Sequence, residues 1–196
     1  MLSSDEAFDE QLPLGLQIKA PLHFTPLEVA RCAAELLAPT PGMAVLDVGA
    51  GAGKLCLAAA LAVPTATFVG VELRGHLVQL ATRLAARLQL QNVRFVHADA
   101  LDLDWSQFDS FYLYNPFAEQ LSGSAFVLDG SIELDPHNFV PYVAGVRQRL
   151  ANARVGTRVV TYHGFGAPPP PGYDLDRKEL VGSGRLELWI KNRAII

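Results

Sequence analysis

Three glycines at alternate positions, Gly49, Gly51 and Gly53, follow the acid Asp47 and lie between two apolar runs. Glycine lets the backbone turn sharply, and it lets a ligand approach without meeting a Cβ atom. The second apolar run can form a helix, whose first N–H groups would be free for a ligand. The segment therefore predicts a strand–loop–helix nucleotide site. A dinucleotide fingerprint needs glycine where Lys54 stands, and no Gly-Lys-Ser/Thr of a P-loop is present at the required offset.

Two more acids follow apolar segments further along the chain. Glu72 ends residues 68–72, roughly 20 residues beyond the glycines, which is the spacing at which an acid reaches ribose hydroxyls in Rossmann-type sites. A carboxylate can accept from both hydroxyls, although an acid at a helix start is also favoured by the helix dipole. Asp99 ends residues 95–99, where its alternative role is to cap a turn.

The order of these residues resembles class I S-adenosylmethionine (SAM) methyltransferases, whose first motif is commonly E/D-x-G-x-G-x-G. The resemblance covers about residues 22–192 and implies SAM as the cofactor. It implies that Asp99 accepts from the adenine amino group and that Glu72 binds the ribose. It also implies that Asp47 and the first loop hold the methionine part and its ribose linkage, and Asp47 can brace the glycine-rich turn at the same time. The cofactor-binding residues implied in this way are Asp47, Gly49, Ala50, Gly51, Gly53, Glu72, Leu73, Asp99 and Ala100.

The segment Tyr114-Asn115-Pro116-Phe117 follows a fourth apolar run. It resembles the N/D-P-P-Y/F motif of methyltransferases that act on planar or amide nitrogens, but it has one proline instead of two. It is also similar to the Asn-Phe segment of non-SET protein-lysine methyltransferases. The resemblance implies that Asn115 contacts the cofactor and aims the acceptor as the catalytic residue, with Tyr114, Pro116 and Phe117 around the substrate. The alternative is an ordinary strand exit into a proline turn.

Two flanking segments complete the expected site. Thr25 and Pro26 have the features of a helix N-cap and first turn, with Glu28 completing a capping box. Related lysine methyltransferases carry a similar aromatic-x-Thr-Pro segment over the methyl donor, which implies cofactor contact for Thr25 and substrate contact for His23. His163 follows a fifth apolar run and is expected to line the acceptor pocket.

Strand-like and helix-like segments alternate along the chain and end in a hairpin, which predicts an α/β protein. The resemblance implies a three-layer Rossmann-like sandwich with a mainly parallel sheet and a C-terminal antiparallel hairpin. Residues 1–25 are expected to form an N-terminal arm or lid, and residues 26–196 the methyltransferase domain. The expected strands are 43–48, 66–71, 92–97, 110–114 and 158–162, with a hairpin of 179–181 and 185–190, and the expected helices are 26–37, 54–63, 75–90 and 136–151.

The 196 residues have a net charge of −4, which disfavours a broad nucleic-acid surface. Cys32 and Cys56 lie in Ala/Leu-rich segments and are expected to be small core residues rather than a disulfide. No secretory signal, membrane span or metal-ligand spacing is apparent, so a cytoplasmic protein without a bound metal is expected. The composition does not indicate an oligomeric state.

The family resemblance implies SN2 transfer of the SAM methyl group to a nucleophile. A protein side-chain amine is the first expected acceptor, a small molecule the second and nucleic acid the third. A non-catalytic SAM-binding partner subunit is the alternative from another class.

Overall fold

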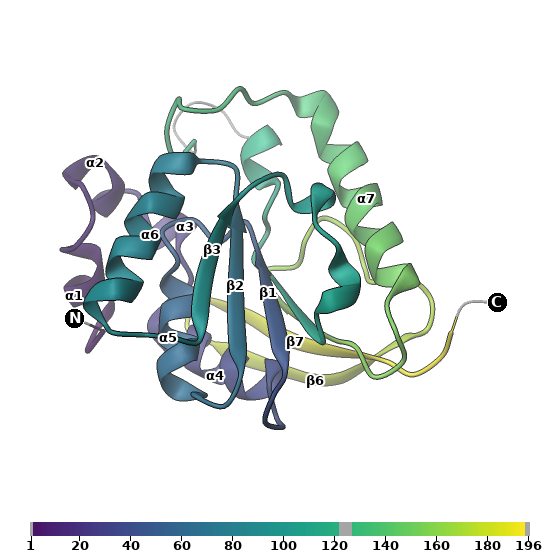
Figure 1. The fold of residues 1–196 in the computed structure, drawn as a ribbon. Coiled ribbons are helices and arrows are strands. Elements are labelled where there is room, and N and C mark those ends of the chain that lie inside the picture. The colour runs from purple at the N-terminus through teal and green to yellow at the C-terminus, as the bar shows by residue number, and fades with distance from the viewer. Residues whose placement is uncertain (1, 122–126, 195–196) are drawn as a thin grey trace.

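The computed structural model describes residues 2–121 and 127–194. Its centre is one seven-stranded sheet of order β3-β2-β1-β4-β5-β7-β6 (Figure 1). The first five strands are parallel, and β7 is antiparallel to both β5 and β6. The strands are β1 (Ala44–Val48), β2 (Thr67–Glu72), β3 (Val93–His97), β4 (Ser110–Leu113), β5 (Arg158–Tyr162), β6 (Tyr173–Val181) and β7 (Gly184–Lys191).

Alternate residues of the central strands enter two separate cores, as the pleat of a β-strand requires. On β1, Val45 packs with one helical layer, whereas Leu46 and Val48 pack in a cluster with α7 (Phe139–Asn152). The layer on the Val45 face contains α4 (Leu27–Leu37), α5 (Lys54–Ala62) and α6 (Gly75–Arg87), and α7 lies apart from these helices (Figure 1). The central strands β1, β2, β4 and β5 are therefore buried on both faces, which explains why they are mostly apolar.

The N-terminal arm folds into three short helices, α1 (Asp5–Asp9), α2 (Leu14–Gln17) and α3 (Ala20–His23). It buries Phe8, Leu12, Leu16, Ala20 and Phe24 in a third cluster with side chains of α5 and α6. Short 3-10 turns fill the remaining connections: η1 (Ala100–Asp102), η2 (Trp105–Gln107), η3 (Ala118–Leu121) and η5 (Pro136–Asn138). Within the described ranges, no helix has the length and apolarity needed to cross a lipid bilayer.

The α/β sandwich, parallel sheet and terminal hairpin are confirmed, and most predicted boundaries lie within one or two residues of the observed ones. The capping box at Thr25 is wrong. Pro26 is the N-cap of α4, and the Thr25 hydroxyl instead shares a hydrogen bond of 3.1 Å with the Tyr112 hydroxyl. The Asp5 carboxylate accepts from the Leu27 amide at 3.0 Å and stabilises the helix start.

The chain reverses its direction of strand addition between β1 and β4, since β2 and β3 lie on one side of β1 and β4 and β5 on the other. Ligands of open α/β sheets bind outside the carboxyl ends of the strands at this switch point. Here the loops after β1 and β4 touch: a Cβ added to Gly49 would lie 3.3 Å from Pro116 Cβ. The predicted glycine loop and the predicted acceptor segment therefore meet.

Candidate active site

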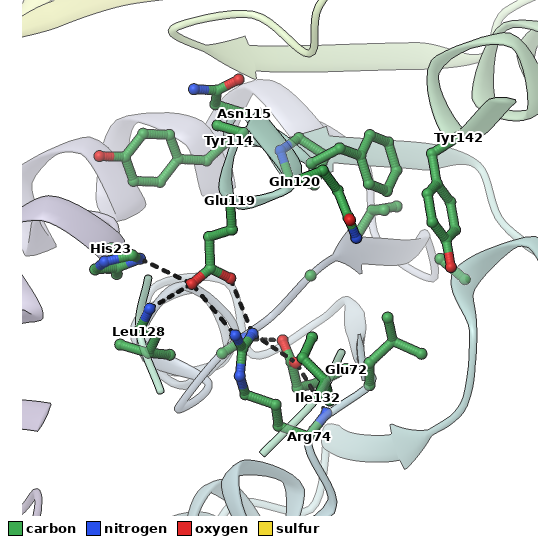
Figure 2. Close-up of a pocket in the computed structure, with 18 of the residues that line it drawn as sticks. His23, Glu72, Arg74, Tyr114, Asn115, Glu119, Gln120, Leu128, Ile132 and Tyr142 are labelled. Carbon is green, nitrogen blue, oxygen red and sulfur yellow. Dashed lines mark hydrogen bonds and ion pairs between the residues drawn. The ribbon is translucent and has the colours of Figure 1, made fainter. Parts of the chain in front are cut away.

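A cavity of about 410 Å³ lies at the carboxyl ends of the parallel strands. Its walls come from the loops after β1 to β5 and from the end of the N-terminal arm. Figure 2 shows the side chains around it. Of the residues predicted from the sequence, those that line this cavity are Gly49, Gly51, Glu72, Leu73, Asp99, Ala100, Tyr114, Asn115, Pro116, Phe117, His23 and His163.

The glycine loop is compressed between neighbouring elements. Gly49, Gly51 and Gly53 all have positive φ, a region that L-residues with a Cβ rarely adopt. A Cβ on Gly51 would lie 2.8 Å from the Phe24 ring, and one on Gly53 would lie 2.5 Å from the Phe95 ring. Gly53 is the N-cap of α5 and lines neither this cavity nor the smaller one beside it, so its left-handed backbone and its packing account for the glycine.

Glu72 is 7% exposed at the end of β2 and faces the cavity. One carboxylate oxygen accepts from the Gly51 amide and the other from the Arg74 amide, both at 3.0 Å. A carboxylate has about four acceptor sites, so two stay available for a ligand's hydroxyls. Glu72 therefore braces the glycine loop and also presents acceptors to the cavity.

Asp99 follows the neighbouring strand β3, also lines the cavity, and accepts hydrogen bonds on both carboxylate oxygens. One accepts from the Leu101 amide at 2.8 Å, which is the turn cap expected as its alternative role. The other accepts from the Tyr142 hydroxyl at 2.8 Å, and the Tyr142 ring stacks on Phe117 with centroids 5.0 Å apart. Burial, the hydrogen bond to Asp99 and the nearby acids raise the pKa of Tyr142 to about 12, so the hydroxyl stays protonated and donates.

Asn115 and His163 follow neighbouring strands, β4 and β5, and both adopt the left-handed region with φ of 42° and 57°. The backbone N–H of Asn115 donates to the Gly164 carbonyl at 2.8 Å, which joins the chain after β4 to the chain after β5. Asparagine tolerates this conformation better than most residues, so the backbone itself favours Asn here. The Asn115 side chain makes no hydrogen bond to any other residue that the structure describes, and in Figure 2 its amide is directed away from Arg74 and Glu119.

Comparisons with known proteins address the same region. A family model described as "Methyltransferase domain" matches residues 39–121, from the loop before β1 to the end of η3. A search of curated proteins found no significant match. The matched region is less than half of the chain, and it contains the glycine loop, Glu72, Asp99 and Asn115.

Solved structures of methyltransferases share the fold of this chain. TrmN from Thermus thermophilus is 24% identical with a TM-score of 0.65, over 90% of this chain and 52% of that one, so the present chain spans about half its length. An RNA methyltransferase from Salinibacter ruber in complex with S-adenosyl-L-homocysteine is 20% identical with a TM-score of 0.59, over 88% and 95% of the two chains. Magnesium protoporphyrin IX methyltransferase (ChlM) from Synechocystis with bound SAM is 14% identical with a TM-score of 0.56, over 96% and 82%.

A smaller cavity adjoins the main one and shares its His23 and Gly49 walls. Asp47, Ala50 and Thr25 line this smaller cavity rather than the main one. Burial raises the pKa of Asp47 to about 7, although the hydrogen bond from the Cys56 thiol at 3.4 Å opposes the shift. Both cysteines are free, in agreement with the core interpretation, but Cys56 is also a donor to a buried acid.

The cavity wall contains a charged cluster that the sequence did not reveal. Arg74 is 5% exposed, and its guanidinium contacts Glu119 at 2.9 Å, with Glu72 at 3.8 Å (Figure 2). It also contacts Asp129 at 3.1 Å. Glu119 also accepts from the Leu128 amide at 2.5 Å. Burial by itself would raise the pKa of Asp129, but hydrogen bonds from Ser131 and Arg74 outweigh it and lower the pKa to about 2.

This cluster joins the chain after β4 to the end of β2. Leu128, Ile132 and Leu134, which follow Glu119 in the chain, also line the cavity. His23 faces Glu119 with Nδ1 3.9 Å from Oε1. Burial lowers the pKa of His23 below its ordinary value despite the opposing charge of Glu119. His23 is therefore held mainly neutral at pH 7 on the wall shared by the two cavities.

Proposed function

We propose that the main cavity and its smaller neighbour together bind SAM, and that the domain transfers the SAM methyl group to a protein side-chain amine. The observation that carries this proposal is the convergence, in one cavity, of the glycine loop, Glu72 and Asp99 with the segment Tyr114–Phe117. When bound, SAM supplies a methyl group that is activated by the sulfonium charge. The protein then has to hold, orient and shield the reactants.

The residues around the cavities fit each part of this cofactor. Gly49 and Gly51 line the main cavity without a side chain, and Glu72 has acceptor sites free for ribose hydroxyls. Asp99, with its rotamer fixed by Tyr142, would accept from the adenine amino group beside Leu73 and Ala100. Asp47 in the smaller cavity would accept from the ammonium of the methionine part, next to Thr25 and Ala50.

The charge of the cavity wall supports an amine acceptor. Its lining has three carboxylates, Glu72, Asp99 and Glu119, against the single guanidinium of Arg74. This excess of negative charge suits a sulfonium and an alkylammonium, and it disfavours the phosphates of a nucleic acid. The Asn115 side-chain oxygen would accept an N–H from the neutral amine and aim its lone pair, while Tyr114 and His163 line the approach.

A small-molecule acceptor is the second candidate, because one observation favours it. Next to the ion pairs of Arg74 with Glu119 and Asp129, the apolar side chains Leu128, Ile132 and Leu134 line the cavity, and such a lining suits a compact, partly apolar acceptor. RNA is a third outcome, since a structural neighbour is described as an RNA methyltransferase.

Incubation with isotope-labelled SAM and cell extract separates these acceptors. We expect the label in the protein fraction, at a side-chain amine identified by mass spectrometry. A matched reaction with the Asn115→Gly variant should transfer far less label. Label in small molecules or RNA would overturn the assigned acceptor, and no transfer to any fraction would favour a non-catalytic SAM-binding subunit.

A further inference from the structure

Lys54 is a buried cation in an electrostatically unfavourable place. It follows Gly53 as the first residue of α5, and its side chain is 4% exposed. The N-terminus of a helix carries a partial positive charge, so an ammonium there is disfavoured. Removing a charge from water is also costly unless the charge is paired. Lys54 therefore depends on its partners.

Those partners come from one face of α1 in the N-terminal arm. The Lys54 ammonium lies 2.7 Å from Asp5 Oδ1 and 2.9 Å from Asp9 Oδ1, and 5.1 Å from the centre of the Phe8 ring. Residues three and four apart lie on the same side of a helix, so one side of α1 presents both carboxylates and the ring to the ammonium. The residue directly after the glycine loop is thus bound to a segment that lies before α4 in the chain.

The far end of the same arm forms part of the cavity wall. Leu22 and His23 line the main cavity, and the Phe24 ring lies against Gly51 where a Cβ would be 2.8 Å away. Between α1 and this wall, Leu12 and Leu16 are buried against α5 and α6, so the arm is packed along its length.

We propose that Lys54 is a positioning residue which latches the N-terminal arm over the glycine loop and thereby slows release of the methyl donor. This inference rests on the proposed SAM site, because it assigns the arm the role of a wall of that site. Asp5 and Asp9 carry the negative half of the latch. Asp9→Asn is the cleanest lesion, since Asp5 also accepts from the Leu27 amide and its loss would disturb α4.

Limited trypsin digestion tests the latch without any acceptor. Lys19 is the one tryptic site before Arg31, and in the docked arm its ammonium donates to the Val127 carbonyl at 2.5 Å. Breaking one partner of a buried ion pair is strongly destabilising, so we expect cleavage after Lys19 to be about tenfold faster or more in Asp9→Asn and Lys54→Met. Lys54→Arg should retain most of the protection. Lys178→Met is the matched control, because Lys178 pairs with Glu187 on the distant hairpin.

The second readout is the dissociation rate of S-adenosylhomocysteine, measured by stopped flow. We expect release to be about tenfold faster in Asp9→Asn and Lys54→Met than in the wild type. Tryptic cleavage outside the arm should be unchanged in both variants. Unchanged cleavage at Lys19 and unchanged release in Asp9→Asn would overturn the latch. Faster release in Lys54→Met alone would overturn it too, because Lys54 would then act on the ligand directly. Failure of the wild type to bind S-adenosylhomocysteine would contradict the proposed function, whereas the Lys19 cleavage rates would still test the latch.

Discussion

Replacing Asn115 separates a role in chemistry from a role in the backbone. Its φ of 42° penalises any residue with a Cβ, but glycine adopts this region freely. Asn115→Gly therefore removes the side-chain amide and keeps the backbone, whereas Asn115→Ala removes the amide and strains the backbone. If the amide aims the acceptor, both variants should lose turnover. If Asn115 serves only the turn, Asn115→Gly should be close to wild type.

The two expected effects have different sizes. A misplacement of about 1 Å in a reactant costs on the order of 10²-fold in rate, so both variants should transfer methyl groups roughly 100-fold more slowly. A left-handed conformation costs an L-residue with a Cβ about 1–2 kcal/mol. Each kcal/mol lowers the melting temperature of a domain of this size by about 2–4 °C, so Asn115→Ala should melt several degrees below Asn115→Gly. The hydrogen bonds of the Asn115 amide to Gly164 and of Ala118 to the Asn115 carbonyl involve backbone atoms only and persist in both variants.

The assay pairs a single-turnover rate at saturating SAM with a dissociation constant for S-adenosylhomocysteine. It uses the acceptor found with the labelled extract. We expect the dissociation constant of Asn115→Gly to stay near that of the wild type while the rate falls. Full turnover in Asn115→Gly would refute the reasoning and leave the site without a catalytic side chain, relying on positioning alone.

Three further perturbations test single contacts. Gly51→Ala should displace Phe24 and weaken the binding of S-adenosylhomocysteine. Gly42→Ala is the control, because Gly42 has a φ of 83° and open space around its Cβ, so this substitution adds only backbone strain. Equal losses of affinity for the two variants in calorimetry would remove Gly51 from the cavity wall. In the folded protein, Asp47 keeps its proton up to about pH 7, whereas in the unfolded chain it loses the proton near pH 3.8. The free energy of unfolding should therefore fall as the pH rises between these values and level off above them. Denaturant titrations of Asp47→Asn should show no such fall. Tyr142→Phe should free the Asp99 carboxylate and weaken the binding of S-adenosylhomocysteine, while the ring keeps its stack on Phe117. Tyr173→Phe, which removes a hydroxyl donor to Leu150 at the other end of α7, should bind the ligand normally. An equal loss of affinity in both variants would contradict a specific role for the Tyr142 hydroxyl at Asp99.

The sequence predicted the central strands and their helices because each is marked by local patterns. The β5 bounds agree residue for residue, since residues 158–162 are rich in β-branched and aromatic residues and lie between Gly156 and Gly164. The edge strand β6 was predicted to be much shorter than it is. Most of its residues are exposed and several are charged, as is common at sheet edges, so they lack the apolar signal of a buried strand.

The contacts that the sequence could not predict join residues far apart in the chain. Thr25 has the local features of an N-cap, but the hydroxyl of Tyr112 provides a partner that only the fold brings near. Arg74 stands two residues after the predicted ribose acid, and nothing local pairs it with Glu119 or Asp129. Lys54 was visible as a departure from the dinucleotide fingerprint, but its carboxylate partners lie on the arm.

Calorimetry with S-adenosylhomocysteine, on the wild type and on Glu72→Ala, is the most direct test of the proposed site. The wild type should bind this ligand and not NAD. Loss of hydrogen bonds to a charged acceptor costs about 1.5–3 kcal/mol, so Glu72→Ala should bind roughly one to two decades more weakly. Glu187→Ala, on the distant hairpin, should bind like the wild type. Equal affinity in a folded Glu72→Ala protein, or binding of NAD in place of S-adenosylhomocysteine, would contradict the account.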